Sequence, residues 1–187
     1  MNGYTGKILL INLTERRISI IDTKDYEPWV GGHGIGSALF WDLVEDKAIS
    51  GFDPQNTLTI MTSPLTGTLA PGAAGRTELQ GIGIQSYPIE WFTRGNIGGR
   101  FGAMLKFAGW DGIVIQGKAD KPVWIDIRDS DVWFKDSVSL WGLDTWKTQE
   151  MICEEGSGKS DFTDWLKTGV GQVMGRTTQR RAVLAIG

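Results

Sequence analysis

The sequence predicts an α+β fold, rich in β-strands, with two halves related by a pseudo-twofold axis. The chain has 187 residues, 41% of them hydrophobic and 22% charged, which suits a globular domain with a sizeable core. The order hairpin, helix, strand occurs twice, and the helices are too few for a doubly wound α/β sheet. The two sets of elements are 7–21, 35–46 and 58–61, and then 122–135, 143–155 and 181–186.

In the first half, apolar residues alternate on both sides of Thr14-Glu15-Arg16, which is typical of a β-hairpin over 7–21. A glycine-rich stretch at 30–36 then leads into apolar positions with helical spacing, so we expect a helix over 35–46. The short apolar run at 58–61 indicates a buried strand.

The middle of the chain begins with a loop-rich stretch, and regular elements follow it. Residues 77–84 form a candidate strand that Gly81 and Gly83 weaken. Glycines precede a second helix, over 100–108, and a clear strand follows it. In the second half, we interpret 156–160 as a linker between the helix over 143–155 and a further glycine-rich segment. These remaining segments are the loop 63–75, the strand 111–117 and the glycine-rich run 169–175.

Charge and composition exclude several functions. The net charge of -3 and the pI of about 5.2 argue against a nucleic-acid or anionic-membrane surface. With one cysteine, Cys153, and one histidine, His33, the chain cannot build a disulfide, a zinc site or an iron–sulfur cluster from its own Cys and His. No apolar stretch approaches the ~20 residues of a membrane span, and we expect a cytoplasmic protein without a signal peptide.

Glycine and tryptophan are unusually frequent. The 26 glycines are twice the usual share of about 7%, and their spread along the chain indicates close approach of the backbone to other groups. The nine tryptophans favour an aromatic core and interface. We interpret Cys153 as a small buried apolar residue and assign no role to Lys159.

Two glycine pairs lie where an anion could bind. Gly31-Gly32 and Gly98-Gly99 each precede a predicted helix, whose N-terminal N–H groups attract phosphate, although each pair is a weak signal alone and tight helix–strand packing is the other interpretation. Arg76 follows a flexible loop, and Arg94 and Arg100 flank the second pair. These arginines are either solvated surface residues or ligands of a phosphorylated cofactor, because the guanidinium binds phosphate bidentately.

Several motifs in order resemble the N-terminal domain of the tungsten-containing aldehyde:ferredoxin oxidoreductases. They include Gly-Tyr-Thr-Gly-Lys-Ile-Leu at 3–9, Val-Gly-Gly-His-Gly-Ile-Gly at 30–36 and Ser-Pro-Leu-Thr-Gly-Thr at 63–68. Further along lie Asn-Ile-Gly-Gly-Arg-Phe-Gly at 96–102, Leu-Lys-Phe-Ala-Gly-Trp-Asp at 105–111 and Gly-Val-Gly-Gln-Val-Met-Gly at 169–175. The likeness covers most of the chain.

The resemblance implies a saddle-like base for a tungsten or molybdenum ion held by two pyranopterin dithiolenes, with Mg²⁺ bridging their phosphates. Arg76 matches the family's arginine toward those phosphates, and Asn96 matches the asparagine whose backbone carbonyl reaches the magnesium. Gly98 and Gly99 match glycines close to a pterin, and Lys167 resembles a basic element of the family. The resemblance gives His33 no fixed role, so a pterin contact, a proton relay and a structural role stay open.

The resemblance also implies what lies outside the chain. We interpret residues 1–187 as one pterin-binding domain, shortened at 156–168, and expect a 4Fe-4S cluster and the substrate pocket on downstream domains or a separate iron–sulfur subunit. The implied reaction oxidises an aldehyde to a carboxylate and passes electrons to ferredoxin, and no catalytic residue is assigned within the chain. The alternatives are a non-catalytic binding or assembly module and a truncated relative. A homodimer is left open.

Overall fold

The computed structural model describes residues 3–71, 75–85, 88–157 and 182–186. The chain divides into two compact units, residues 1–135 and residues 136–187, each of which is described by itself. The first unit holds the sheet and the candidate site. The second unit contains the short 3-10 helix η2 (Val138–Leu140) and the helix α3 (Thr145–Ser157).

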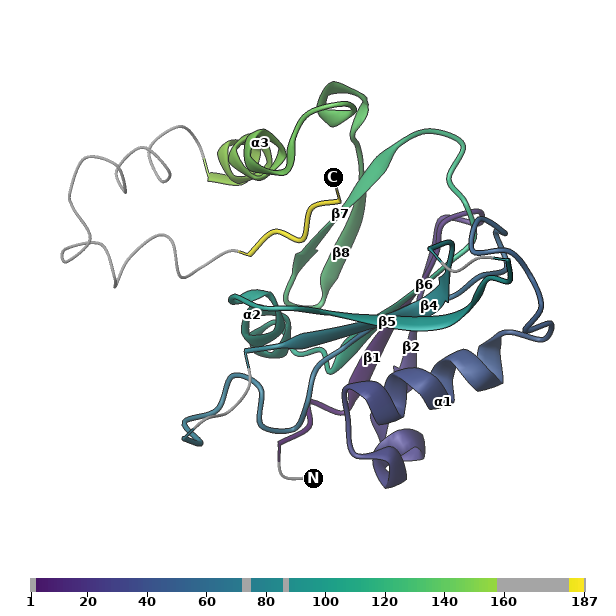
Figure 1. Cartoon of the computed structure of the whole chain (residues 1–187). Helices are drawn as coiled ribbons and strands as arrows, with labels where there is room; N and C mark the ends of the chain where they lie inside the picture. The colour runs from purple at the N-terminus through teal and green to yellow at the C-terminus, as the bar shows by residue number, and fades with distance from the viewer. Residues whose placement is uncertain (1–2, 72–74, 86–87, 158–181, 187) are drawn as a thin grey trace. The chain divides into compact units, whose positions relative to one another are not determined.

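A mixed six-stranded sheet organises the first unit, in the order β2-β1-β6-β3-β4-β5 (Figure 1). Its strands are β1 (Lys7–Asn12), β2 (Arg17–Asp22), β3 (Leu58–Met61), β4 (Thr77–Gly83), β5 (Trp91–Ile97) and β6 (Gly112–Gln116). Strands β1 and β6 are parallel, and the other neighbours pair antiparallel. The strands β2 and β5 are therefore the two edges of this sheet.

Helix α1 (His33–Leu43) lies along one face of the sheet (Figure 1). Its Ile35 and Leu39 pack against Ile8, Met61 and Val114, all of which are almost fully buried. Further along the helix, Phe40 contacts Phe92 of β5 with 4.6 Å between ring centroids. We call this side of the sheet the α1 face.

Helix α2 (Phe101–Phe107) follows β5 directly, and the 3-10 helix η1 (Thr23–Trp29) precedes α1. A Cβ atom at Gly102 of α2 would lie 2.5 Å from Thr77 Oγ1 and 3.2 Å from Thr66 Cγ2. The absence of a side chain at Gly102 thus allows α2 to pack closely against the start of β4 and the loop before it.

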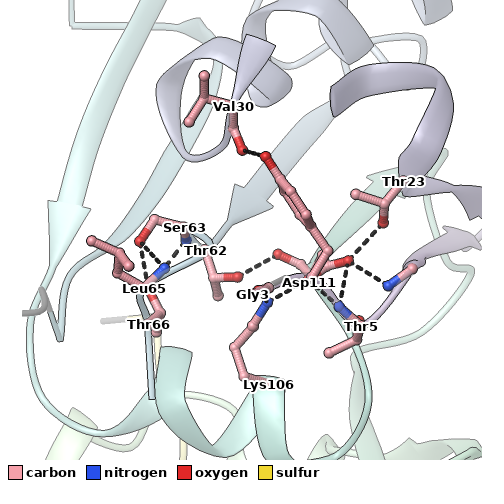
Figure 2. Close-up of polar contacts among 12 residues, drawn as sticks. Gly3, Thr5, Thr23, Val30, Thr62, Ser63, Leu65, Thr66, Lys106 and Asp111 are labelled. Atoms are coloured by element: carbon pink, nitrogen blue, oxygen red, sulfur yellow. Dashed lines mark hydrogen bonds and ion pairs between the residues drawn. The ribbon is translucent and has the colours of Figure 1, made fainter. Parts of the chain in front are cut away.

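Asp111 anchors the N-terminal segment beside the sheet (Figure 2). Its buried carboxylate accepts hydrogen bonds from the amides of Thr5 and Gly6, each at 2.9 Å, and from Thr23 Oγ1 at 2.7 Å. Lys106 Nζ lies 2.5 Å from Asp111 Oδ1 and also donates to the carbonyl of Gly3 at 2.6 Å. The motifs at 3–9 and 105–111 are therefore joined by one polar network.

The second hairpin, predicted over 122–135, is confirmed. Its strands are β7 (Val123–Arg128) and β8 (Asp131–Asp136), which form a separate two-stranded sheet. Trp110 Nε1 donates to the carbonyl of Asp129 in the turn of this hairpin, at 2.7 Å. The α+β class, the first hairpin, both glycine-preceded helices and the strands near 58–61, 77–84 and 111–117 are also confirmed.

Four expectations were wrong. The described residues 182–186 are not a strand, so the second hairpin–helix–strand unit is not completed there. Helix α3 continues through residues 156–157, where we expected a linker, and Cys153 is only half-buried. Among the tryptophans that the structure describes, Trp110 alone is buried, so the expectation of a tryptophan-rich core is wrong, whereas the expected aromatic interface stays a prediction.

No helix in the described part of the chain is both long enough and apolar enough to cross a bilayer. Within the same residues, His, Cys, Asp and Glu side chains form no group of three that could hold a metal ion.

Candidate functional site

Four of the five predicted cofactor residues lie at one end of the β4–β5 hairpin, namely Arg76, Asn96, Gly98 and Gly99. Thr77 is paired with Ile97, so Arg76 and Gly98, which flank these two residues, belong to the same end of the hairpin. A Cβ atom at Gly75 would lie 3.0 Å from the carbonyl oxygen of Gly99, which places the segment before β4 directly beside the glycine pair. The structure therefore brings Arg76 and the segment from Asn96 to Gly99 together.

This end of the hairpin is open. Arg76, Asn96, Gly98 and Gly99 are all exposed, and a Cβ atom added at either glycine would meet nothing within 4 Å. Gly99 has a positive φ of 83°, a conformation that favours glycine, so its identity follows from the backbone. Gly98 has no such requirement. At Gly98, therefore, neither a steric clash nor the backbone conformation requires glycine. The missing side chain leaves room for a ligand close to the main chain.

Gly95 is a second position at which neither space nor backbone conformation requires glycine. It lies in β5 next to Asn96, its φ is not in the positive range, and a Cβ atom there would also meet nothing within 4 Å. Glycine in a strand interior costs about 0.5–1 kcal/mol relative to alanine, so the fold alone does not favour it at this position. The sequence analysis did not select Gly95, although its position between two polar residues of β5 is visible in the sequence.

A row of polar side chains continues from this end along the α1 face. Glu78 is paired with Asn96, and Gln80 is paired with Arg94. Because side chains alternate along strands, all four project to the face that carries Met61, which is paired with Glu78 on β3. Asn96 is therefore the outer member of a polar cluster that extends toward the first turn of α1.

His33, in that first turn, contacts this cluster. Its Nδ1 atom lies 3.3 Å from Glu78 Oε1 and contacts Gln80 Nε2. Gln80 Nε2 also donates a hydrogen bond to the carbonyl of His33 at 3.3 Å. Arg94 Nη1 lies 3.6 Å from the same Glu78 oxygen. Glu78 and Gln80 were not selected from the sequence, since strand pairing alone places them beside His33 and Arg94.

The other glycine pair is explained by packing. A Cβ atom at Gly31 would lie 2.8 Å from Pro64 Cδ and 3.1 Å from Ser63 Cα, and the amide of Gly32 donates to the carbonyl of Thr62 at 2.7 Å. Gly32 also has a positive φ. This loop therefore fits tightly against the segment after β3, and the packing explanation of Gly31-Gly32 holds.

Two residues of the sequence analysis fall outside the described residues. Lys167, expected to contribute a basic contact, and Lys159, which received no role, both lie in 158–181. The glycine-rich run at 169–175 is in the same range.

The fold, the motifs and the open end of the β4–β5 hairpin define the class of this chain. It belongs to the aldehyde ferredoxin oxidoreductase N-terminal domain family, whose model matches residues 8–170. Among curated proteins, the tungsten-containing aldehyde ferredoxin oxidoreductase of Pyrococcus horikoshii is 40% identical over 163 residues, covering 85% of this chain and 26% of that protein.

Two further relatives act on other substrates according to their names. The WOR-like subunit of an aliphatic sulfonate oxidoreductase from Pyrococcus furiosus is 30% identical over 147 residues, covering 76% of this chain and 23% of that protein. The benzoyl coenzyme A reductase complex BamBC, solved with 1,5-dienoyl-CoA, contains a chain with a TM-score of 0.74 and 30% identity. That match covers 82% of this chain and 23% of that chain.

The chain thus spans about a quarter of the length of the curated relatives it matches. The matched quarter recurs in proteins named for an aldehyde, a sulfonate and a coenzyme A thioester.

Proposed function

We propose that this chain is the cofactor-binding base of an oxidoreductase related to the tungsten-containing aldehyde ferredoxin oxidoreductases. The observation that carries the proposal is the meeting of Arg76 with the open Asn96–Gly99 segment at one end of the β4–β5 hairpin. The family relationship supplies the cofactor class, a tungsten or molybdenum bis-pyranopterin, because the curated relatives are named as tungsten-containing.

The described residues fit such a group. Pterin phosphates are bound by guanidinium groups and N–H donors. Arg76 provides an exposed guanidinium, and it lies beside an exposed stretch of main chain. A flat ring system needs space against that main chain, which the missing side chains at Gly95 and Gly98 provide. In this proposal Arg76 holds a phosphate, the Asn96 carbonyl faces Mg²⁺, and Gly98 and Gly99 lie against a pterin. Lys167 remains part of the proposal as a further basic contact.

When bound, the metal–pterin group would supply two-electron redox chemistry at a centre that the pterin sulfurs ligate. The contribution of this chain is then binding and orientation. Arg76 neutralises phosphate charge, and the β4–β5 pairing fixes the spacing between Arg76 and Asn96. None of these residues takes part in bond making, which agrees with a catalytic apparatus located on downstream domains or another subunit.

The remaining parts of the proposal concern those downstream elements. We expect a 4Fe-4S cluster there to carry electrons to ferredoxin and the substrate pocket to lie there as well. Oxidation of an aldehyde to a carboxylate is the reaction we favour, because four of the curated relatives carry that enzyme's name.

The test is cofactor retention in the 187-residue chain, produced in a host supplied with tungstate and molybdate. Metal is measured by elemental analysis, and pterin by fluorescence after oxidation. We expect Arg76→Ala and Gly98→Val to lower both contents severalfold with little change in the free energy of unfolding, since both positions are exposed. Arg17→Ala is the matched control, because Arg17 is exposed on β2, the opposite edge of the sheet.

Equal metal and pterin contents in Arg76→Ala, Gly98→Val and Arg17→Ala would refute the assigned roles. A parent chain that never acquires metal or pterin would instead favour the binding or assembly module that the sequence analysis left open.

A further inference from the structure

Strand β2 is an edge of the six-stranded sheet (Figure 1), and the backbone groups on its outer side have no partner strand among the described residues. The amide of Thr23, directly after β2, donates to the carbonyl of Gly6 at 3.1 Å, so Thr23 bonds toward β1. The direction of backbone hydrogen bonds alternates along an antiparallel strand, and the odd-numbered residues of β2 therefore bond to β1 as well. The N–H and C=O groups of Ile18, Ile20 and Asp22 point to the open edge.

The same edge exposes apolar side chains. Ile18 and Ile20 are 36% and 57% exposed. In the β1–β2 register they lie opposite Ile11 and Leu9, both of which are fully buried, so they extend the apolar face of the sheet to its edge. Strand β2 contains no proline, and its register with β1 has no bulge. Two common devices against edge pairing are therefore missing from this strand.

Strand β2 is also complementary to itself. In a sheet that two copies continue around a twofold axis, the edge strands are antiparallel, and each side chain stays on its own face. Residues directly opposite each other are then both even-numbered or both odd-numbered. A pairing centred on Ser19 brings Ile18 of each copy opposite Ile20 of the other. It also brings Arg16, which precedes β2, opposite Asp22 at its end, and both of these residues are exposed.

The alternative register is less favourable. A pairing centred on Ile20 would place Ile18 of one copy opposite Asp22 of the other. Apolar β-branched pairs and pairs of opposite charge stabilise neighbouring strands, whereas an isoleucine opposite a carboxylate gains neither contribution. The order of apolar and charged residues along β2 therefore selects the register centred on Ser19.

We propose that β2 is the interface of a homodimer in which two copies of this chain pair their β2 strands around a twofold axis centred on Ser19. The isoleucines form the middle of the interface, and an Arg16–Asp22 ion pair forms each end. The β4–β5 hairpin is at the opposite edge of the sheet, so the candidate cofactor site stays free and the inference does not rest on the proposed function. A contact of one strand per copy is smaller than the standard interface of about 800 Å² per partner, so the dimer should dissociate on dilution.

The test is sedimentation equilibrium of the 187-residue chain over a range of concentrations. We expect Ile20→Lys to weaken dimerisation about tenfold, because a lysine on an edge strand opposes pairing. Leu69→Lys is the matched control, since it makes the same kind of change at a fully exposed residue in the loop before β4. Its dissociation constant should equal that of the parent. A parent chain that stays monomeric, or a Leu69→Lys chain that loses as much affinity as Ile20→Lys, would overturn the proposal.

The double variant Ile18→Glu with Ile20→Lys tests the register. In the pairing centred on Ser19, the introduced glutamate of each copy faces the introduced lysine of the other, and opposite charges at facing positions stabilise a strand pair. We expect the double variant to dimerise more tightly than either single variant. In the pairing centred on Ile20, the two lysines would face each other. A folded double variant, by circular dichroism, that dimerises no better than Ile20→Lys would overturn this register.

A cross-link gives a second readout of the same register. Ser19 bonds to β1, so the two Ser19 residues form a non-hydrogen-bonded pair with Cα atoms about 4.5 Å apart, a distance that suits a disulfide. Cys153 is the only cysteine, so Ser19→Cys is made together with Cys153→Ser and should give a covalent dimer under mild oxidation. Thr93→Cys with Cys153→Ser is the control, because Thr93 is also half-buried but lies on the other edge strand, β5. Equal rates of cross-linking at the two positions would contradict the pairing.

Discussion

Asp111→Asn tests whether the network around Asp111 holds the fold together. The substitution keeps the size of the side chain but removes its charge and one of its two acceptor oxygens. In the native chain these oxygens serve two backbone amides, one hydroxyl and the ammonium of Lys106. With an amide nitrogen in place of one oxygen, either Lys106 or a backbone N–H faces another donor.

The expected loss of unfolding free energy follows from the burial of Asp111 and Lys106. Asp111 is 3% exposed, and the Lys106 side chain is 8% exposed, so neither group can turn to solvent without moving the chain around it. Removal of one partner from a buried ion pair costs about 3–5 kcal/mol, because a buried charge is left unbalanced. Domains of this kind have a free energy of unfolding of about 5–15 kcal/mol, so the variant should lose a large part of it.

The assay is urea unfolding at pH 7, followed by circular dichroism and by tryptophan fluorescence. Glu15→Gln is the control, because Glu15 forms an ion pair with Arg17 in which both side chains are more than half exposed. Such pairs contribute about 0–1 kcal/mol. A loss below about 1 kcal/mol in Asp111→Asn would refute the reasoning.

The same pair of proteins gives a pH test. Burial raises the pKa of Asp111, but the hydrogen bonds from Lys106, Thr5 and Thr23 outweigh it, and the pKa lies below the ordinary 3.8. A carboxylate whose pKa is lowered on folding stabilises the protein above its unfolded-state pKa, and this contribution is lost as the pH falls through the folded-state pKa. The stability difference between parent and Asp111→Asn should therefore narrow below pH 3.8. A stability difference that stays constant below pH 3.8 would contradict the lowered pKa of Asp111.

Two further predictions concern α1 and its surroundings. In Gly34→Ala the new Cβ would lie 2.1 Å from the carbonyl oxygen of Trp29, so unfolding experiments should show a loss of about 1–3 kcal/mol, whereas Gly95→Ala, with open space, should show almost none. The pKa of Tyr26 is raised to about 12. The larger cause is burial of the side chain, and the second is the hydrogen bond that Tyr26 donates to Asp42 at 3.0 Å. Asp42→Asn should move that ionisation toward pH 10 in an absorbance titration, and an unchanged titration would disprove the contribution of Asp42.

Strands with a clear apolar pattern could be predicted from the sequence, including the edge strand β2, whereas the edge strand β5 could not. The hairpin β1–β2 alternates because one of its faces packs on the core. Strand β5 was missed because it is an edge strand with most of its residues exposed, so it needs no alternation. The apolar run at 182–186 resembles a strand in composition, but strand formation requires a hydrogen-bonded partner that composition does not specify.

For the candidate site, the family motifs gave the residues, and the strand register gave their geometry. Arg76 and Asn96 are far apart in sequence, and their spacing alone predicts no contact. The β4–β5 pairing brings them to one end of the hairpin and adds Glu78 beside Asn96. Glu78 was not selected from the sequence because a single glutamate within a strand has no pattern of its own.

The glycines show how packing and binding can be separated within one motif. Gly102 and Gly98 lie in the same Asn-Ile-Gly-Gly-Arg-Phe-Gly run, yet a Cβ atom would meet Thr77 at Gly102 and open space at Gly98. The fold explains the first glycine and does not explain the second. A serine or alanine at Gly98 should leave the chain equally stable, and the proposed pterin contact would account for glycine at this position. Alanine at Gly102 should therefore destabilise the chain, and alanine at Gly98 should affect only what binds to it.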